Sequence, residues 1–395
     1  MASQALAAYA LLPPEEVESF LDLLGREFSA DPTEVWKRAQ AYHAEATASN
    51  LLMLQRAVEP PRQELFRRLN MAPGGTALLV DLRRRLLPTL ADHPERASID
   101  ADLLHLFRSW FNRGFLQLRR IDWQTPAAVL ERLIDYEAVH QIQGWGDLRR
   151  RLERDRRCYG FFHPALPDDP LIFIEVALTR GLPANVQMLL DPQSEVGDPH
   201  RADHAVFYSI TNCQEGLRGV SFGNFLIKQV AEDLGREFHN LRNFLTLSPI
   251  PGFRSWLTTL TSGRPPVSAA LTALLAAKPT AAADVPRPLE GELTALCADY
   301  LLHAKRGDRE PADPVARFHL ANGASLERIN WLGDESVTGI RRSFGLTANY
   351  VYRLSELEQN HEAYVRELRV VATPTLARLA RRGRRDRAAE PESRR

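Results

Sequence analysis

"GVSFGNFLIKQVAEDLGREFHNLRNFLTLSP", residues 219–249, is the stretch that decides the fold of this chain. It opens with a glycine-bearing loop, continues with apolar residues at helical spacing, and ends in a short apolar run at 244–247. The stretch before it, "HAVFYSITNC" (204–213), is a β-rich run. Strand, helix and strand in this order predict a βαβ-like unit, and hence an α/β domain.

Other short β-rich runs precede this unit. They are bounded by proline, glycine and aspartate, and they read "RCYGFFHP" (157–164), "PLIFIEVALTRG" (170–181) and "NVQMLLD" (185–191). We expect each of them to be a strand. Residues 15–135 instead offer amphipathic helices and few strand signals, and Asp31-Pro32 within them is typical of a helix start. We expect this region to pack as a helical bundle.

The composition of the sequence changes twice toward the end of the chain. Alanine and proline dominate residues 264–290, which predicts a linker with some helix, and "GELTALCADYLLHAKR" (291–306) predicts a helix. Residues 355–382 return to a charged helix. The arginine-dense stretch 377–395 is typical of disordered, solvent-exposed chain, with contact to an anionic partner as the alternative. We therefore expect a helical bundle at 1–136, an α/β domain at 137–382 and a basic disordered tail at 383–395.

The composition is that of an ordinary globular protein, because 44% of the 395 residues are hydrophobic and 25% are charged. Lysine plus arginine and aspartate plus glutamate each number 50, so no net charge favours nucleic acid or a membrane surface. The three cysteines form no CxxC pair, which is typical of a reducing compartment.

The apolar N-terminal stretch lacks a basic region and is broken by Pro13 and Pro14. We expect neither a signal peptide nor a membrane anchor, and a cytoplasmic location.

The loop before the central helix carries Gly216, Gly219 and Gly223. Backbone N–H groups at a helix start, approached closely past glycines, form a phosphate site. The pattern matches neither GxGxxG nor GxxxxGK[ST], so the known nucleotide motifs are absent. Two interpretations stay open, a phosphate site and an ordinary glycine turn.

Ser248 stands at the carboxyl end of a predicted strand, where α/β proteins place ligands. Pro249 and Pro251 fix their own φ angles and bias the residues before them to extended shapes. The Ser248 hydroxyl should therefore be held in one direction. The alternative is a turn serine that bonds to its own backbone.

His319 lies in "RFHLANGA", between the apolar residues Phe318 and Leu320. It is either a site residue or a satisfied core or surface histidine. His200 and His204 have the i, i+4 spacing that binds a metal on a helix, but they stand in a loop entering a strand, and we expect no metal there. The sequence contains no GxSxG elbow and no paired-carboxylate signature.

Several stretches, taken together and in order, closely resemble the malonyl-CoA decarboxylase family. They are "YEAVH...W.DL..R", "RRCYGFFHP...PLIFIEVALT", "GLRGVSFGNFLIKQVAEDL", "LTLSPIPGF..WL", "DPVARFHLANGA", "INWLGD.S..G" and "GLTANYVY". The resemblance covers residues 137–353 well and the N-terminal helical region more loosely. Its most specific motifs are "LSPIPGF" and "FHLANGA".

The resemblance implies a fold and an activity. The fold class is α + α/β, with an N-terminal helical bundle that serves oligomerisation, as a homo-dimer or tetramer, and a catalytic domain with the acetyltransferase-like GNAT fold. Coenzyme A would bind with its pyrophosphate at the helix start after a central strand, which is the 216–224 loop. The reaction would convert malonyl-CoA to acetyl-CoA and CO2 without a metal or an organic cofactor.

The resemblance also implies roles for single residues. Ser248 matches the catalytic serine of the family, and His319 matches its partner histidine. The expected contacts are with the malonyl group for Ser209, Ser221, Asn349 and Tyr352, and with coenzyme A for Gly216, Arg218, Gly219, Gly223 and Asn224. The family commonly carries a glutamate in "GVELG", and this chain has "GVSFG", with Ser221 in its place.

These groups suit a decarboxylation without a nucleophile, because a thioester carbonyl can accept the departing electrons as an enolate. We expect Ser248 and His319 to hydrogen-bond the malonyl carboxylate, and His319, or a water that it holds, to protonate the enolate. Two alternatives stay open. One is an acyl-CoA-dependent acyltransferase on the same fold, which needs an acceptor, and the other is a malonyl-CoA sensor without catalysis.

Overall fold

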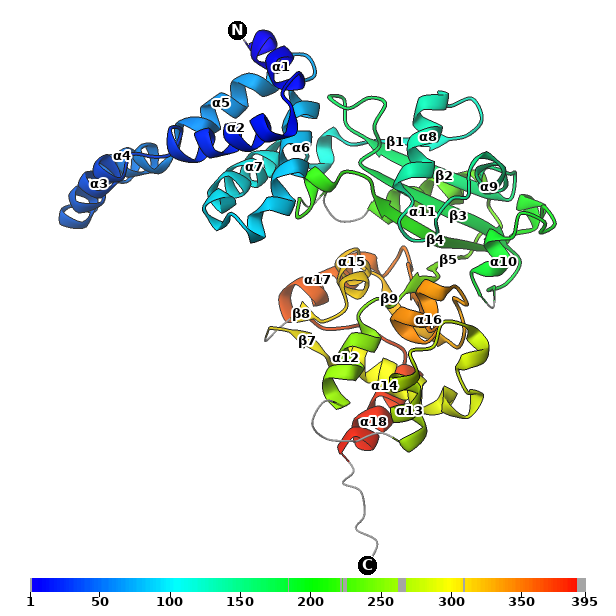
Figure 1. The fold of residues 1–395 in the computed structure, drawn as a ribbon. Helices are drawn as coiled ribbons and strands as arrows, with labels where there is room; N and C mark the ends of the chain where they lie inside the picture. Colours follow the sequence, from blue (N-terminus) through cyan, green and yellow to red (C-terminus); the bar gives the residue numbers. More distant parts are fainter. Residues whose placement is uncertain are drawn as a thin grey trace, which may run out of the picture. The chain divides into compact units, whose positions relative to one another are not determined.

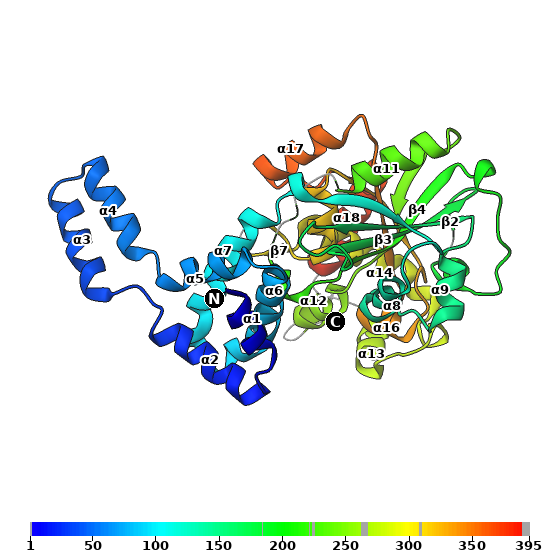
Figure 2. The same cartoon turned by 90° about the horizontal axis from the view of Figure 1, so that it is seen from above.

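The structure is a computed structural model. It describes residues 2–183, 185–220, 222, 226–261, 268–307 and 310–388. The chain forms two compact units, each considered by itself below (Figures 1 and 2). The first unit comprises residues 1–117, 161–171 and 212–223, and the second comprises residues 118–160, 172–211 and 224–395.

The first unit is helical, as the sequence predicts. Its helices are α1 (Ala2–Ala10), α2 (Pro14–Arg26), α3 (Pro32–Ala44), α4 (Ala48–Val58), α5 (Pro61–Asn70), α6 (Gly75–Leu86), α7 (Ala97–Trp110) and the short 3-10 helices η1 (Leu87–Ala91), η2 (Pro94–Arg96), η3 (Arg113–Phe115) and η5 (Glu215–Leu217). Its core includes Leu24, Phe66 and Phe107, which have no exposed surface. The buried Arg83 is ion paired, with its Nε 2.7 Å from Asp100 Oδ1. Apolar burial and paired charges therefore hold this unit together.

Helices α3 and α4 pack against each other and bury no residue fully. Asp31 caps α3, because its side chain accepts a hydrogen bond from the Thr33 N–H at 2.9 Å, which confirms the predicted helix start. Large apolar side chains of this helix pair, such as Trp36 and Leu52, stay exposed instead of joining the core.

In the described part of the chain, eight strands form one mixed sheet, almost wholly within the second unit. The order is β1-β2-β3-β4-β5-β10-β6, and β9 pairs with β10. The strands are β1 (Gln117–Ile121), β2 (Arg156–Phe162), β3 (Ile172–Thr179), β4 (His204–Asn212), β5 (Asn243–Thr246), β6 (Ser248–Pro249), β9 (Ser325–Asn330) and β10 (Thr347–Val351), with a separate hairpin of β7 (Lys305–Arg306) and β8 (Glu310–Pro311).

The predicted strand–helix–strand unit is present as β4, α11 (Leu226–Glu237) and β5. Strands β4 and β5 run parallel, and their pairing ends where Phe207 meets Thr246. The last backbone bond runs from the Leu247 N–H to the Phe207 carbonyl at 3.0 Å. Beyond it, the chain that leaves β5 turns to pair with β10 through β6. The two strands therefore separate just before Ser248.

Some helices of the second unit, α11 and α8 among them, lie on opposite sides of its sheet (Figure 2). The helices of this unit are α8 (Ala127–Tyr136), α9 (Trp145–Arg151), α10 (Gln187–Leu190), α11, α12 (Phe253–Thr261), α13 (Ala269–Ala277), α14 (Glu290–His303), α15 (Pro314–Ala321), α16 (Val337–Ser343), α17 (Leu357–Glu367), α18 (Pro374–Ala388) and the 3-10 helices η4 (Pro199–Arg201), η6 (Ala282–Asp284) and η7 (Arg287–Leu289). Helix α11 contacts β2, where the Tyr159 hydroxyl donates to Asp233 at 2.9 Å. Helix α9 contacts β3, where Arg151 donates to Glu175 at 2.8 Å.

Three local predictions are wrong. The stretch 355–382, expected as one charged helix, contains α17 and the start of α18, which Pro374 begins anew. Strand β1 lies inside the region expected to be helical. Its residues 117–120 are exposed or half-buried, so this edge strand has no apolar run from which it could be predicted. The run at 185–191 is the one-turn helix α10 and not a strand. Val186 and Leu189, at i, i+3 spacing, pack with Tyr208 in the core, and such a short apolar run cannot be assigned by periodicity alone.

The C-terminal helix α18 packs along α14 and continues to Ala388. Gly383 permits this contact, because a Cβ there would lie 2.3 Å from the Ala295 carbonyl oxygen. The helix thus includes the first residues of the segment expected as a tail from residue 383, and residues 389–395 lie outside the described residues. Within the described part of the chain, every helix is too short or too polar to span a membrane.

Candidate active site

Ser248 starts strand β6, immediately after the chain leaves β5, and only 5% of its surface is exposed. Its Oγ donates to Thr246 Oγ1 at 2.8 Å and lies 2.9 Å from Nε2 of His319. The hydroxyl is thus bonded to side chains and not to its own backbone, unlike a turn serine. The structure brings Ser248 and His319 together across 71 positions of sequence.

Strand β10 fixes the position of Thr246. It pairs with β5 at one end and with β6 at the other, and side chains bridge the irregular step between them. The Asn349 Nδ2 donates to the Thr246 carbonyl at 2.6 Å, and the Tyr350 N–H donates to Thr246 Oγ1 at 3.1 Å. Thr246 Oγ1 is therefore held where it accepts the hydrogen bond from Ser248.

His319 lies on α15 with 3% of its surface exposed. Its Nδ1 is 2.6 Å from the Tyr352 hydroxyl, and its ring stacks on Tyr350 with 4.6 Å between the ring centroids and 23° between the planes. Burial lowers the pKa of His319 to about 3, because the charged imidazolium loses its hydration. The imidazole is therefore neutral at neutral pH.

The proton positions in this group follow from its bonds. Because Ser248 donates to Thr246, its oxygen is left to accept from Nε2–H of His319. The neutral ring then carries no proton on Nδ1, which accepts from the Tyr352 hydroxyl. The four groups form one chain of donors, Tyr352 to His319 to Ser248 to Thr246. In this arrangement the imidazole does not act as a base toward the serine.

Asp313 ties the histidine helix to the loop after Ser248. It caps α15 by accepting from the N–H groups of Val315 and Ala316, each at 2.9 Å. The same carboxylate accepts from the Gly252 N–H and from the Tyr300 hydroxyl, the latter at 3.3 Å. Gly252 has to be glycine, since a Cβ there would lie 2.1 Å from the Tyr300 oxygen.

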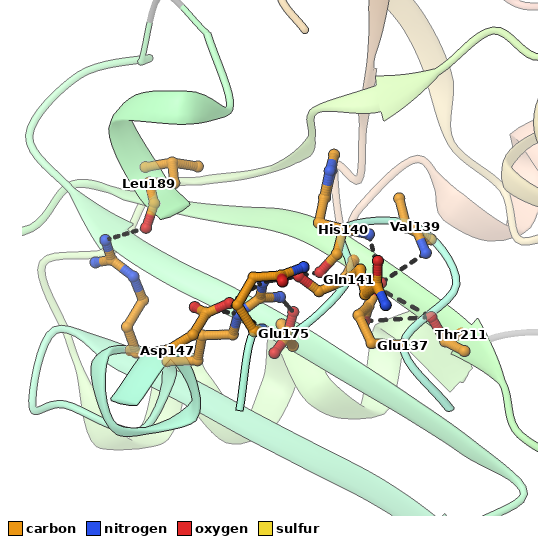
Figure 3. Close-up of polar contacts among 12 residues, drawn as sticks. Glu137, Val139, His140, Gln141, Asp147, Glu175, Leu189 and Thr211 are labelled. Atoms are coloured by element: carbon orange, nitrogen blue, oxygen red, sulfur yellow. Dashed lines mark hydrogen bonds and ion pairs between the residues drawn. The ribbon is translucent and has the colours of Figure 1, made fainter. Parts of the chain in front are cut away.

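Ser209 stands on β4, two residues past the last pair with β5. Its Oγ donates to Oε2 of Glu137 at 2.7 Å, and the Thr211 hydroxyl donates to the same oxygen at 3.4 Å. The other oxygen, Oε1, accepts from the N–H groups of Val139 and His140 at 2.7 Å each (Figure 3). Burial raises the pKa of Glu137 above its ordinary value, against the opposing effect of these bonds.

A buried ion-pair network holds the loop that carries Glu137 (Figure 3). Arg151 donates to Glu175 at 2.8 Å, to Asp147 at 3.0 Å and to the His140 carbonyl at 2.8 Å. Since Arg151 and Glu175 are both nearly inaccessible to solvent, their mutual pairing offsets much of the cost of burying each charge. The position of Glu137 relative to β4 is thereby fixed.

The expected phosphate loop is only partly described. The Gly216 and Arg218 carbonyls both accept from Arg83 of α6, at 2.8 and 2.7 Å. A Cβ at Gly216 would lie 2.0 Å from the Val80 carbonyl oxygen, so close packing on α6 by itself explains this glycine. Gly219 has a φ of +84°, a left-handed backbone conformation that favours glycine. Ser221, Gly223 and Asn224 lie outside the described residues.

Sequence reasoning missed several residues of the site. Thr246 is two positions before Ser248, so strand alternation could have placed it on the same face. Asp313 precedes Pro314 at a helix start, the same signal that identified Asp31. Tyr350 and Glu137 gave no such local signal. Asn349 is buried, and its amide also accepts from Arg328 Nε at 3.3 Å, so it is engaged with the sheet.

In the described residues, no three His, Cys, Asp or Glu side chains lie close enough together to bind a metal ion. His200 lies in η4 and His204 begins β4, so the pair does not share a helix, and His204 Nδ1 is 2.7 Å from Asp203. That the reaction needs no cofactor stays a prediction.

Comparison with known families agrees with the resemblance seen in the sequence. The malonyl-CoA decarboxylase C-terminal domain matches residues 114–390, and the malonyl-CoA decarboxylase N-terminal domain matches residues 28–111. The chain belongs to the malonyl-CoA decarboxylase family. The expected class of enzyme, a carboxy-lyase, is confirmed with it, as is the expected order of a helical region and a mixed α/β domain.

Individual relatives extend the match over most of the chain. The mitochondrial malonyl-CoA decarboxylase of Rattus norvegicus is 38% identical over 357 residues, covering 82% of this chain and 72% of the relative. Crystal structures of malonyl-CoA decarboxylases from Rhodopseudomonas palustris and Agrobacterium vitis are 48% and 47% identical, with TM-scores of 0.89 and 0.87. These matches cover 95% and 96% of this chain and 93% and 94% of the respective structures.

Proposed function

We propose that this member of the malonyl-CoA decarboxylase family converts malonyl-CoA to acetyl-CoA and CO2 at Ser248 and His319, without a metal or an organic cofactor. The observation that carries the proposal is the buried chain of hydrogen bonds from Tyr352 through His319 and Ser248 to Thr246. Donors that are held in place and desolvated before the reaction stabilise charge that develops in a transition state.

The chemistry needs hydrogen-bond donors and no nucleophile. The bond between the α-carbon and the carboxylate carbon breaks, its electron pair moves into the thioester as an enolate, and CO2 leaves. When the substrate binds, the Ser248 Oγ–H turns from Thr246 to the malonyl group, and the His319 Nε2–H turns from Ser248 to it. The two donors orient the breaking bond as negative charge moves from the carboxylate to the thioester oxygen. The neutral state of His319 supports this role, since a cation would hold the negative charge on the carboxylate.

Substrate binding is proposed for the residues that the family resemblance indicates. Ser209, Ser221, Asn349 and Tyr352 contact or shape the malonyl group, Asn349 through its bond to the Thr246 carbonyl. Coenzyme A phosphates bind the loop of Gly216, Arg218, Gly219, Gly223 and Asn224, which leads into α11. Helix α11 has 12 residues, long enough for its first-turn N–H groups and dipole to favour an anion.

We also propose that the chain works as a homo-oligomer in the cytoplasm. The exposed apolar side chains of α3 and α4 support self-association, because neither helix buries a residue fully within the chain. Cys158, Cys213 and Cys297 are buried thiols without disulfide bonds, which suits a reducing compartment.

The test is direct. Purified protein is incubated with malonyl-CoA and EDTA, and acetyl-CoA and CO2 are measured. We expect equal amounts of both products. Ser248→Ala should lower kcat by roughly 10²–10³-fold, as the loss of one oriented donor does in other enzymes. His319→Asn should nearly abolish turnover and leave coenzyme A affinity largely intact.

Ser19→Ala and His43→Asn provide matched controls, since both residues are exposed on the N-terminal helices. Both variants should keep the wild-type rate. Tight binding of malonyl-CoA without turnover would contradict the proposal and indicate a sensor. Transfer of the acyl group to an added amine or carrier, with no CO2, would indicate an acyltransferase.

A further inference from the structure

Two serines stand at equivalent places where β4 and β5 separate. Ser209 is two residues past Phe207 on β4, and Ser248 is two residues past Thr246, the partner of Phe207. At about 3.3 Å per strand residue, each serine Cα lies within about 7 Å of this last pair. Both serines therefore follow the same pair of residues, at the point where two neighbouring strands separate.

Decarboxylation leaves an enolate that needs a proton. The sequence predicts that His319, or a water that it holds, supplies it, but the Ser248 group is a poor source. His319 is held neutral, and burial raises the pKa values of Tyr350 and Tyr352 well above the usual range for tyrosine. The Ser248 proton is engaged with Thr246. These groups can donate hydrogen bonds, but none of them releases a proton readily near neutral pH.

We propose that Ser209 delivers this proton to the α-carbon and that Glu137, bonded to Ser209, supplies it. Ser209 is then a catalytic residue, and Glu137 is a positioning residue that acts through Ser209. This inference rests on the proposed function and deepens it, because it assigns the second half of the reaction to a different strand and a different loop. It also places a carboxylate behind the reaction centre of a chain that has Ser221 where the family commonly has glutamate.

The geometry of Glu137 suits the transfer. Oε1 is occupied by the N–H groups of Val139 and His140, which leaves Oε2 to carry a proton toward Ser209. When Glu137 is ionised, Ser209 donates to it. When Glu137 is protonated, the 2.7 Å contact runs from Oε2–H to the Ser209 oxygen, and the serine proton turns toward the substrate.

The proton balance closes. The α-carbon takes the proton of the Ser209 hydroxyl, the Glu137 proton restores the serine, and Glu137 takes a proton from water. The sum is malonyl-CoA plus one proton giving acetyl-CoA and CO2, with no oxidant or reductant. The charged and titratable side chains that face Glu137 are Arg151 of α9 and Glu175 of β3, and His140 of its own loop contacts it through the backbone N–H.

The experiment isolates the proton step. Acetyl-CoA is incubated with enzyme in D2O, and deuterium entry into its methyl group is followed by NMR, beside kcat for malonyl-CoA as a function of pH. We expect Glu137→Gln and Ser209→Ala each to slow both rates by about 10²-fold or more. The double variant should be no slower than the worse single variant, because the two residues act as a unit. In the wild type, kcat should fall as rising pH removes the Glu137 proton, and Glu137→Gln should lose this alkaline limb.

Asp135→Asn is the matched control, since it makes the same change from carboxylate to amide at an exposed side chain two residues from Glu137, and it should keep both rates within about threefold of wild type. Wild-type exchange and kcat in Ser209→Ala would overturn the inference, and this variant removes a single oxygen in case Glu137→Gln does not fold. An unchanged alkaline limb in a folded Glu137→Gln would overturn it as well. A wild-type enzyme that releases no CO2 would instead overturn the proposed function.

Discussion

His319 is enclosed by aromatic rings and by two hydroxyl groups. Tyr350 stacks on its ring, Phe318 lies edge-on at 5.2 Å between centroids, and both nitrogens are bonded. Burial is the one cause of its lowered pKa, because no charged group offsets the lost hydration. The residue is therefore kept in the single protonation state that can accept on Nδ1 and donate from Nε2.

This burial predicts acid sensitivity of the fold. In the unfolded chain His319 takes up a proton as the pH falls below about 6.5, whereas the folded chain resists protonation down to about pH 3. Because the unfolded chain binds this proton and the folded chain does not, the folded state is fully stable above pH 6.5 and loses stability as the pH falls. Its loss should lower the free energy of unfolding by about 1.4 kcal/mol per pH unit below 6.5. Urea unfolding at pH 7, 6 and 5 measures the slope.

The comparison with variants assigns the slope to its histidines. His319→Asn should remove the share of His319, and about 2 kcal/mol of the loss between pH 6.5 and 5 should disappear with it. His140, whose pKa burial lowers to about 4, contributes a second share that remains. The exposed His43→Asn should leave the slope unchanged. An identical slope in His319→Asn and the wild type would contradict a neutral buried imidazole.

At the scale of elements, α15 sets the distance between the serine and the histidine. The helix is only eight residues long, too short to be stable by itself, and Asp313 both caps its start and joins it to Gly252. One carboxylate therefore connects the loop that follows Ser248 to the helix that carries His319.

Asp313→Ala should consequently harm both stability and catalysis. Loss of the cap costs about 0.5–2 kcal/mol, and the Gly252 N–H left without its acceptor adds about 1–3 kcal/mol, so we expect a loss of roughly 1.5–5 kcal/mol in unfolding free energy. A displaced histidine should also lower kcat by about 10–100-fold under conditions where the variant is folded. Denaturant unfolding and steady-state kinetics on one preparation measure both effects.

Asp31→Ala removes an exposed cap of the same Asp-Pro type from α3. It should cost about 1 kcal/mol and leave kcat unchanged. A folded Asp313→Ala variant with the wild-type kcat would show that α15 keeps its place without this carboxylate.

Elements with strong local signals could be predicted from the sequence. The β4–α11–β5 unit, the helical first unit and the pairing of Ser248 with His319 were all accessible from periodicity, caps and the family motifs. Strand β1 was not, because an edge strand needs no apolar face. Glu137 was not either, since its partner Ser209 is 72 positions away and no local pattern joins them. Contacts of this kind depend on the packed sheet and not on any segment alone.

At the scale of the molecule, the exposed apolar side chains of α3 and α4 could form the contact between copies of the chain in an oligomer. They are Trp36, Leu51, Leu52, Met53 and Val58. The formal net charge is zero, so charge repulsion does not oppose association. Of the occupants that could cover these side chains, a second copy of the chain is the one that we propose, because a helix pair of this kind can bury its surface against its own symmetry mate.

Trp36→Glu combined with Leu52→Glu should therefore break the assembly. Each change puts a charge where burial is expected, and a central tryptophan alone often contributes 2 kcal/mol or more to an interface. Light scattering coupled to gel filtration should show an oligomer for the wild type and a monomer for the double variant.

Lys37→Glu is the matched control, since it adds negative charge to α3 at a polar side chain that is 71% exposed, and it should keep the wild-type mass. Ser248 and His319 belong to the second compact unit, so kcat per chain should persist in the monomer. A wild-type protein that is monomeric at micromolar concentration would contradict this role for α3 and α4.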